Sequence, residues 1–180
     1  MRLLLQAATA MLVLMLTTAG WTQPADLVTT KGRAFIHNGQ TFRFIGMNIR
    51  GISHFGHGDP LPYSNTSDVA TNLDAMQDNG FTVVRLFAAN KHHTTQQNID
   101  NLEDVLDAME TRGIKAILAM TDVYNTSFHP AGDDSYYVQQ PSGWTLLDDS
   151  WFAGGYENNY LPWVKQAVTQ LKGHSAIFAW

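Results

Sequence analysis

Cysteine is absent from this chain of 180 residues. Its absence excludes a disulfide framework, and it also excludes a lipid anchor attached to a cysteine. The folded part must therefore be held together by a hydrophobic core. Hydrophobic residues make up 44% of the sequence, which is ordinary for a globular domain and sufficient for such a core.

Positive charge is also scarce. There are 11 lysines and arginines against 16 aspartates and glutamates, which gives a net charge of −5, and the basic residues form no runs. Proteins that bind nucleic acids neutralise phosphates with clustered lysine and arginine. The composition therefore argues against a nucleic-acid partner.

The N-terminus has the pattern of a secretory signal peptide. Arg2 supplies a positive charge, residues 3–16 are almost entirely apolar, and residues 18–20 are small. The apolar run is too short for a comfortable membrane span, so an uncleaved anchor is the weaker alternative. We expect residues 1–20 to be removed and residues 21–180 to be secreted, extracellular or periplasmic, without membrane contact.

A hairpin is predicted next. Residues 33–37 and 41–45 are rich in strand-forming side chains, and they flank Asn38 and Gly39, which both tolerate a positive φ. The second arm runs on through residues 44–48. We interpret this continuation as the first strand of the main sheet.

Two helix–strand units then repeat each other. The letters LDAM at residues 73–76 precede Gly80 and a strand, and the same letters at residues 106–109 precede Gly113 and a strand at residues 114–120. A helix, a glycine that ends it and a buried strand recur together here, and such a repeat indicates βα units.

A third helix and a fourth strand continue the pattern. Leu161, Val164, Val168 and Leu171 predict one buried helix face, and residues 176–180 form the next strand. A complete (β/α)8 barrel needs about 250 residues. The predicted fold is therefore α/β, a (β/α)8 TIM barrel truncated after about four strands, with the mature chain as its N-terminal half.

One charged side chain interrupts the apolar strand at residues 81–87. The guanidinium of Arg85 is costly to bury without a partner, and it lies near the end of this strand. In (β/α)8 barrels the carboxyl ends of the strands carry the active site. Arg85 is therefore a candidate site residue, and a structural ion pair is the alternative interpretation.

The segment of residues 121–156 shows no helical or strand period, yet it is rich in aromatic residues. Disordered segments are poor in aromatic residues, and long loops in compact domains are usually functional. We therefore expect a long loop that serves the site.

Several segments together resemble the N-terminal half of glycoside hydrolase family 5, in its cellulase and β-mannanase group. They are FRFIGMN at residues 42–48, VRLFAAN at 84–90, LEDVLD at 102–107, YLPWV at 160–164 and IFAW at 177–180. Each is weak alone, but their order and spacing are fairly specific, and they span most of the mature chain. The resemblance implies a secreted hydrolase of O-glycosyl bonds in plant polysaccharide, an endo-β-1,4-mannanase or a cellulase-like enzyme acting on β-mannan or β-glucan.

The family resemblance also implies a retaining mechanism with two glutamates, an acid/base after the fourth strand and a nucleophile on the seventh. This chain has three glutamates, Glu103, Glu110 and Glu157, and none is expected at a strand end. We therefore expect both catalytic glutamates to lie outside the chain, and the fragment alone to be inactive. In the resemblance, Arg85 has a supporting role, because it holds the nucleophile in place and keeps it ionised.

The remaining candidates are polar and aromatic residues near the predicted strand ends. Asn48 and Asn90 could bind sugar hydroxyls or support loop backbone. Aromatic rings suit the apolar C–H face of a sugar ring, with core packing as the alternative. Phe87 stands where the mannanases tend to have tryptophan, so the polysaccharide stays open. The candidate substrate contacts are Asn48, Asn90, Asp122, Tyr124, Trp144, Trp151 and Trp180.

Two other functions remain open. His54 and His57 follow the first strand and His92 follows the second, a placement that would suit a metal-dependent barrel hydrolase. The family resemblance needs no metal or other cofactor. The other alternative is a carbohydrate-binding fragment without catalysis, although such modules are usually β-sandwiches rather than βα repeats. At full length we expect a monomer.

Overall fold

The computed structural model describes residues 27–54 and 68–180. The predicted signal peptide and His57 lie outside these ranges. Within them, no helix has both the length and the apolar character that a membrane crossing requires.

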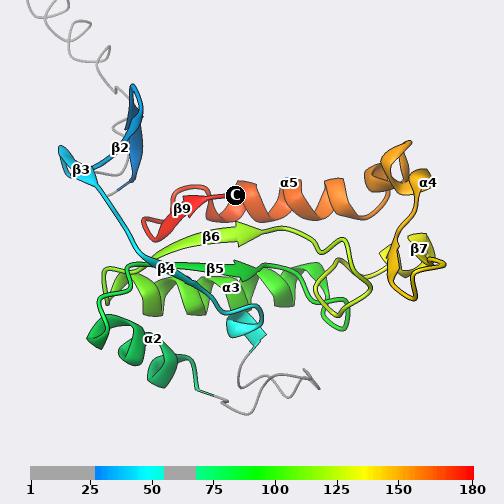
Figure 1. The fold of residues 1–180 in the computed structure, drawn as a ribbon, viewed down its shortest axis with the longest axis horizontal. Helices are drawn as coiled ribbons and strands as arrows, with labels where there is room; N and C mark the ends of the chain where they lie inside the picture. Colours follow the sequence, from blue (N-terminus) through cyan, green and yellow to red (C-terminus); the bar gives the residue numbers. More distant parts are fainter. Residues whose placement is uncertain (1–26, 55–67) are drawn as a thin grey trace, which may run out of the picture.

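Four short parallel strands form the centre of the fold (Figure 1). In chain order and in sheet order alike they are β4 (Gly46–Asn48), β5 (Val83–Phe87), β6 (Lys115–Ala119) and β9 (Ile177–Ala179). Because all neighbours pair in parallel, their carboxyl ends lie at one edge of the sheet. Arg85 is opposite Asn48 on one side and Ile117 on the other. The four predicted parallel strands are confirmed.

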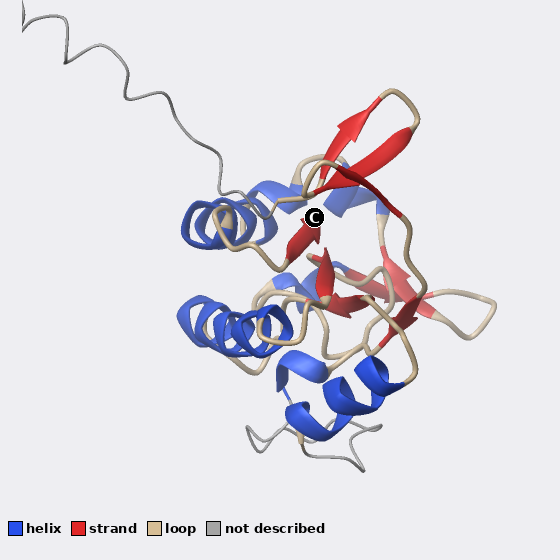
Figure 2. Cartoon of the chain, turned by 90° about the vertical axis from the view of Figure 1, so that its left-hand side faces the viewer, coloured by secondary structure: helices blue, strands red, loops and turns tan. Residues whose placement is uncertain are grey.

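Long helices cover one face of this sheet (Figure 2). They are α2 (Val69–Asp78), α3 (Thr95–Glu110) and α5 (Tyr160–Leu171). Both copies of the repeated LDAM segment place their leucine and methionine in the core between helices and sheet. The buried side chains there include Leu73, Met76, Val84, Leu86, Leu102, Leu106, Met109, Leu118 and Trp163.

The glycines that follow the repeated helices are needed for their backbone conformation. Gly80 has φ +74° and Gly113 has φ +67°, a left-handed region that residues with a Cβ rarely adopt. At the other end of α3, a capping box of Thr94 and Gln97 satisfies the first amides. The sequence therefore specifies both ends of this helix locally.

The buried face of α5 differs from the prediction. Its fully buried side chains are Trp163, Ala167 and Leu171, whereas Val164 and Val168 of the predicted stripe are only half-buried. The large ring of Trp163 takes the core position, and its Nε1 donates a hydrogen bond to the carbonyl oxygen of Met120 at 3.0 Å. Apolar residues lie on both stripes of this helix, so the periodicity alone could not choose between them.

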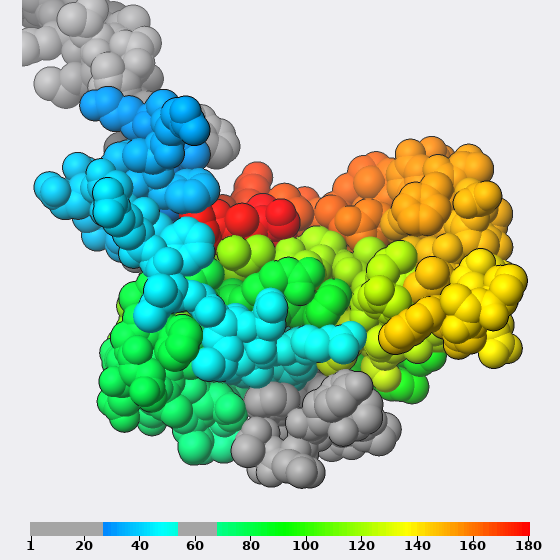
Figure 3. Space-filling view, viewed as in Figure 1, coloured from blue at the N-terminus to red at the C-terminus, as the bar shows by residue number. Residues whose placement is uncertain are grey.

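The predicted hairpin is part of a small three-stranded antiparallel sheet that precedes the parallel sheet. This N-terminal sheet lies at one end of the molecule (Figures 1 and 3). Its strands are β1 (Thr29–Lys31), β2 (Ala34–His37) and β3 (Gln40–Phe42). The predicted turn is confirmed, with φ values of 50° at Asn38 and 74° at Gly39. The second arm, however, is interrupted, because three residues separate the end of β3 from the start of β4.

Close contacts explain that break. A Cβ at Gly46 would lie 2.9 Å from the carbonyl oxygen of Val83, so β4 approaches β5 where only glycine fits. The preceding hairpin turns instead toward the last strand. There Phe35, Phe42 and Phe44 pack around Phe178, with ring centroids 4.9, 5.7 and 5.2 Å from its own.

The segment between β6 and α5 is structured, so the predicted long loop is wrong in that respect. It contains the 3₁₀ helix η2 (Asp133–Tyr136), the hairpin strands β7 (Tyr137–Gln139) and β8 (Thr145–Leu147), the short helix α4 (Asp149–Phe152) and η3 (Gly155–Glu157). We call residues 121–159 the excursion. It has its own core of Tyr137, Leu147 and Trp151, and it lies at the end opposite the N-terminal hairpin (Figure 3).

Candidate active site

A cavity of about 500 Å³ opens at the carboxyl ends of β4, β5 and β6. In a sheet of parallel strands covered by helices, this edge collects side chains from loops that are distant in sequence. Its lining is Asn48, Arg50, Arg85, Phe87, Thr121, Asp122, Val123 and Tyr124. The structure therefore brings together four of the predicted site residues, namely Asn48, Arg85, Asp122 and Tyr124.

Arg85 faces the cavity because strand residues alternate between the two faces of a sheet. Its neighbours Val84 and Leu86 are buried in the core under the helices, whereas Arg85 is exposed. Its guanidinium carbon lies 5.0 Å from the centroid of the Phe87 ring. Within the part of the chain that the structure describes, no carboxylate forms an ion pair with Arg85. Its charge is thus available for an anion.

The sequence reasoning missed Arg50, which follows β4. One nitrogen of its guanidinium lies 2.8 Å from the Asp122 carboxylate, and the group also lies over the rings of Phe87 and Phe128. A signal for it was present: Arg50 is a charged residue two positions after the end of β4, at the same edge of the sheet as Arg85.

Asp122 was expected to contact substrate, and it lines the cavity with most of its side chain buried. Its side chain is only 5% exposed, and its oxygens accept hydrogen bonds from Arg50, from the hydroxyl of Thr126 and from the backbone N–H of Tyr124. A buried carboxylate that is satisfied in this way holds other groups in place. Asp122 thus lines the cavity with a carboxylate that is largely occupied by protein hydrogen bonds and presents little surface to a ligand.

The rings of Tyr124 and Trp144 form an exposed pair beside the cavity. Their centroids are 5.4 Å apart, and the side chains are 44% and 62% exposed. Trp180, the residue after β9, is 43% exposed at the same edge of the sheet. These three predicted contacts are accessible to a ligand.

Two predicted contacts are not accessible. Trp151 is buried in the core of the excursion, and its Nε1 lies 3.3 Å from a carboxylate oxygen of Asp133. Asn90 is fully buried, and its side-chain oxygen accepts a hydrogen bond from the backbone of His92. Asn90 thus has the loop-supporting role, one of the two that its type allows. Exposed and buried aromatic or amide residues look alike in sequence.

The excursion also contains a buried carboxyl group with a perturbed pKa. Burial raises the pKa of Asp133, and burial likewise lowers the pKa of the neighbouring His129. Perturbed groups of this kind often mark active sites. Asp133, however, does not line the cavity, and it bonds to Trp151 in the core of the excursion. We therefore assign it a structural role.

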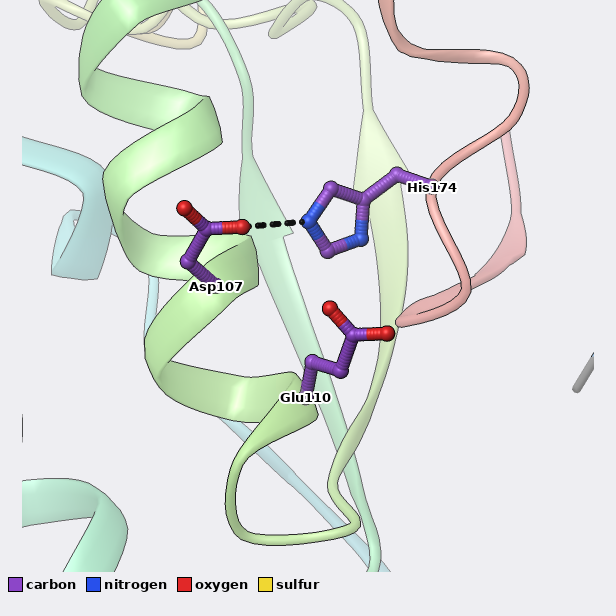
Figure 4. Close-up of side chains that lie close together, drawn as sticks. All are labelled: Asp107, Glu110 and His174. Carbon is purple, nitrogen blue, oxygen red and sulfur yellow. Dashed lines mark hydrogen bonds and ion pairs between the residues drawn. The ribbon is translucent and has the colours of Figure 1, made fainter.

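Of the alternative metal ligands His54, His57 and His92, only His92 has a side chain that the structure describes. His57 lies outside the described residues, and His92 is exposed on a loop. A different group, Asp107, Glu110 and His174, gathers near the amino ends of the strands, the edge opposite the cavity (Figure 4). Its donor atoms lie within 4.8 Å of one another, close enough to consider a cation.

Hydrogen bonding at His174 argues against a cation there. The Nδ1 atom accepts a hydrogen bond from Ala176 N–H at 3.1 Å, so the neutral ring carries its proton on Nε2. That Nε2 lies 3.0 Å from Asp107, to which it donates. Metal binding at Nε2 would require the proton to move to Nδ1, where it would face the amide. The three side chains instead fasten the turn before β9, where Ser175 also bonds to Glu110.

We expect His174→Ala to lower the free energy of unfolding by about 1 kcal/mol, since it removes one neutral hydrogen bond and one exposed pair. Zn²⁺ should leave the melting temperature of the wild-type chain unchanged. Thermal denaturation of the wild-type chain and of His174→Ala, each with and without Zn²⁺, measures the stability loss and the effect of the ion. A rise in melting temperature with Zn²⁺ that His174→Ala abolishes would show that a metal site exists after all.

Comparison with known proteins decides the family. The model of the cellulase family, glycosyl hydrolase family 5, matches residues 35–165. This chain belongs to glycosyl hydrolase family 5. The match includes β4, β5 and β6, which carry the cavity, and also the whole excursion.

Two fungal relatives within this family are similar over most of the chain. Mannan endo-1,4-beta-mannosidase A of Podospora anserina is 23% identical in an alignment 171 positions long, gaps included, that covers 83% of this chain and 42% of the relative. Probable mannan endo-1,4-beta-mannosidase C of Aspergillus terreus is 25% identical in an alignment 186 positions long, gaps included, that covers 87% of this chain and 43% of the relative. This family 5 chain therefore spans less than half the length of these relatives.

The fold agrees with a solved member of the family. The family 5 mannosidase of Rhizomucor miehei superposes with a TM-score of 0.52 at 16% identity, covering 83% of this chain and 42% of that one. This chain has a parallel sheet covered by helices and matches 42% of the solved structure. Its fold is therefore part of a (β/α)8 barrel. The predicted fold class is confirmed.

Proposed function

We propose that this chain is the N-terminal half of a secreted glycoside hydrolase that cleaves internal β-1,4 links in mannan. The arrangement of Arg85 carries the proposal. It places an unpaired guanidinium beside Asn48 in a cavity whose rim has the exposed rings of Tyr124 and Trp144. The names of the two fungal relatives favour mannan over cellulose.

In the proposed mechanism the two reacting carboxyl groups come from strands beyond Trp180. Retaining glycosidases need one carboxylate as nucleophile and one carboxyl group as acid/base, about 5 Å apart. The three glutamates of this chain are exposed and none lines the cavity. The chain alone should therefore bind but not cleave.

Arg85 would act on the nucleophile from across the cavity. An adjacent guanidinium lowers the pKa of a carboxylate and holds it in the ionised form that attacks the sugar. Asn48 would donate or accept a hydrogen bond at a sugar hydroxyl. The Tyr124–Trp144 pair and Trp180 would contact the apolar faces of sugar units on either side.

The proposal is tested with the complete enzyme, extended through the second half of the barrel. We expect it to hydrolyse β-mannan with internal cuts and retention of anomeric configuration, followed by NMR, and to act more slowly on carboxymethylcellulose. Inversion would refute the retaining mechanism, because inverting enzymes also use two carboxyl groups but form no covalent glycosyl-enzyme intermediate. If no β-glycan is cleaved while mannan oligomers still shift the melting curve, carbohydrate binding without catalysis is the better account.

A further inference from the structure

Tyr124, one ring of the aromatic pair beside the cavity, belongs to a short strip of backbone, residues 122–126. Tyr124 forms a β-bridge with Leu146, and the backbone N–H of Leu147 donates to Val123 at 3.1 Å. These bonds join the strip to β8, which follows Trp144 directly. Wherever the strip is held, both rings are held with it.

Asp122 fastens this strip to the barrel. Two of its three side-chain hydrogen bonds, from Tyr124 N–H at 3.1 Å and from the Thr126 hydroxyl at 2.8 Å, stay within the strip. The third comes from Arg50, 72 residues earlier in the chain, at 2.8 Å. Of these bonds, the one from Arg50 connects the strip to a different barrel strand.

Arg50 is itself held in one orientation. Its guanidinium carbon lies 5.3 Å from the Phe87 ring centroid and 5.1 Å from that of Phe128. These two rings stack on each other, with centroids 5.2 Å apart and an interplanar angle of 18°. The backbone carbonyl of Arg50 also accepts a bond from Phe87 N–H at 3.0 Å. A planar guanidinium can lie on rings and bind a carboxylate at once, which an ammonium cannot do as well.

We propose that Arg50 is a positioning residue that determines how tightly the site binds extended oligosaccharides. Through Asp122 it sets where the Tyr124–Trp144 pair stands relative to Arg85. The inference rests on the proposed function, in which sugar units contact that pair. Arg50 then governs, through the aromatic pair, how the sugar units away from the reacting centre are bound.

The test measures binding of β-1,4-linked mannohexaose to the full 180-residue chain by calorimetry. Trp144→Ala should weaken binding about tenfold, a size typical of losing one aromatic contact. Arg50→Ala should weaken it to a similar extent, and Arg50→Lys less. Arg112→Ala is the matched control, because Arg112 forms a comparable ion pair with Asp74 outside the cavity lining, and it should leave affinity unchanged.

A second readout separates positioning from general loss of stability. The indole N–H resonance of Trp144, assigned by its disappearance in Trp144→Ala, should move in unliganded Arg50→Ala and stay in place in Arg112→Ala. The double variant Arg50→Ala/Trp144→Ala should weaken binding by less than the sum of the two single changes, because both changes affect the same aromatic pair. Should Arg50→Ala not fold, Asp122→Asn, which keeps the shape and removes the charge, decides instead.

The outcomes distinguish the inference from the proposed function. If Trp144→Ala weakens binding and Arg50→Ala and Asp122→Asn do not, the positioning role is wrong while sugar binding stands. If Trp144→Ala leaves affinity unchanged, the aromatic pair is not a sugar contact, and the proposed function loses this part of its basis. Additive effects in the double variant would also overturn the inference.

Discussion

Replacing Arg85 by alanine in the complete enzyme should lower kcat on mannan by about 10²- to 10³-fold, the loss typical of removing one preorganised charged donor from an active site. Arg85 faces the cavity without a carboxylate partner among the described residues, so its charge is free to act on the nucleophile. Losing that charge should also raise the pKa of the nucleophile. The acidic limb of the pH–rate profile should therefore move to higher pH.

Arg85→Lys is the control for this prediction. It keeps the charge but loses the planar fork, so kcat should fall less and the acidic limb should stay closer to its wild-type position. An Arg85→Ala enzyme with unchanged kcat and an unchanged pH profile would show that Arg85 has no role in the chemistry.

The second large effect concerns stability. Trp163→Ala should lower the free energy of unfolding by about 3–5 kcal/mol, or prevent folding, because it leaves a large cavity between α5 and the sheet. The Met120 carbonyl would lose its hydrogen-bond donor as well. Urea denaturation followed by circular dichroism measures the change.

Two variants calibrate that measurement. Trp163→Phe fills most of the space and should cost clearly less than Trp163→Ala. Trp144→Ala removes an exposed ring and should change stability by no more than about 0.5 kcal/mol. Equal losses for Trp163→Ala and Trp144→Ala would contradict the assignment of Trp163 to the core and Trp144 to the surface.

The parts of the fold that local sequence signals specify were predictable. Gly80 and Gly113 end their helices at φ values that residues with a Cβ rarely adopt, and the helices before them carry apolar residues at one spacing. The cavity-facing position of Arg85 was predictable because a charge in an otherwise buried strand is rare. These signals depend on residues that are close in sequence.

The parts that depend on distant pairs were not predictable. Arg50 and Asp122 meet across 72 residues, and no local pattern connects them. The choice between Trp144 as an exposed ring and Trp151 as a core ring depends on how the excursion folds onto itself. The buried stripe of α5 likewise follows from the packing of Trp163 against β6 rather than from periodicity.

The most direct test of the central claim is to read the coding sequence beyond the codon for Trp180. If this chain supplies half of a retaining active site, we expect a run similar to Glu-Leu-x-Asn-Glu to follow at once, as the family resemblance implies, and then four further βα units with a second glutamate at the end of the seventh strand. A stop codon directly after Trp180, or a continuation without a glutamate at the end of the fourth strand, would contradict the proposed catalysis.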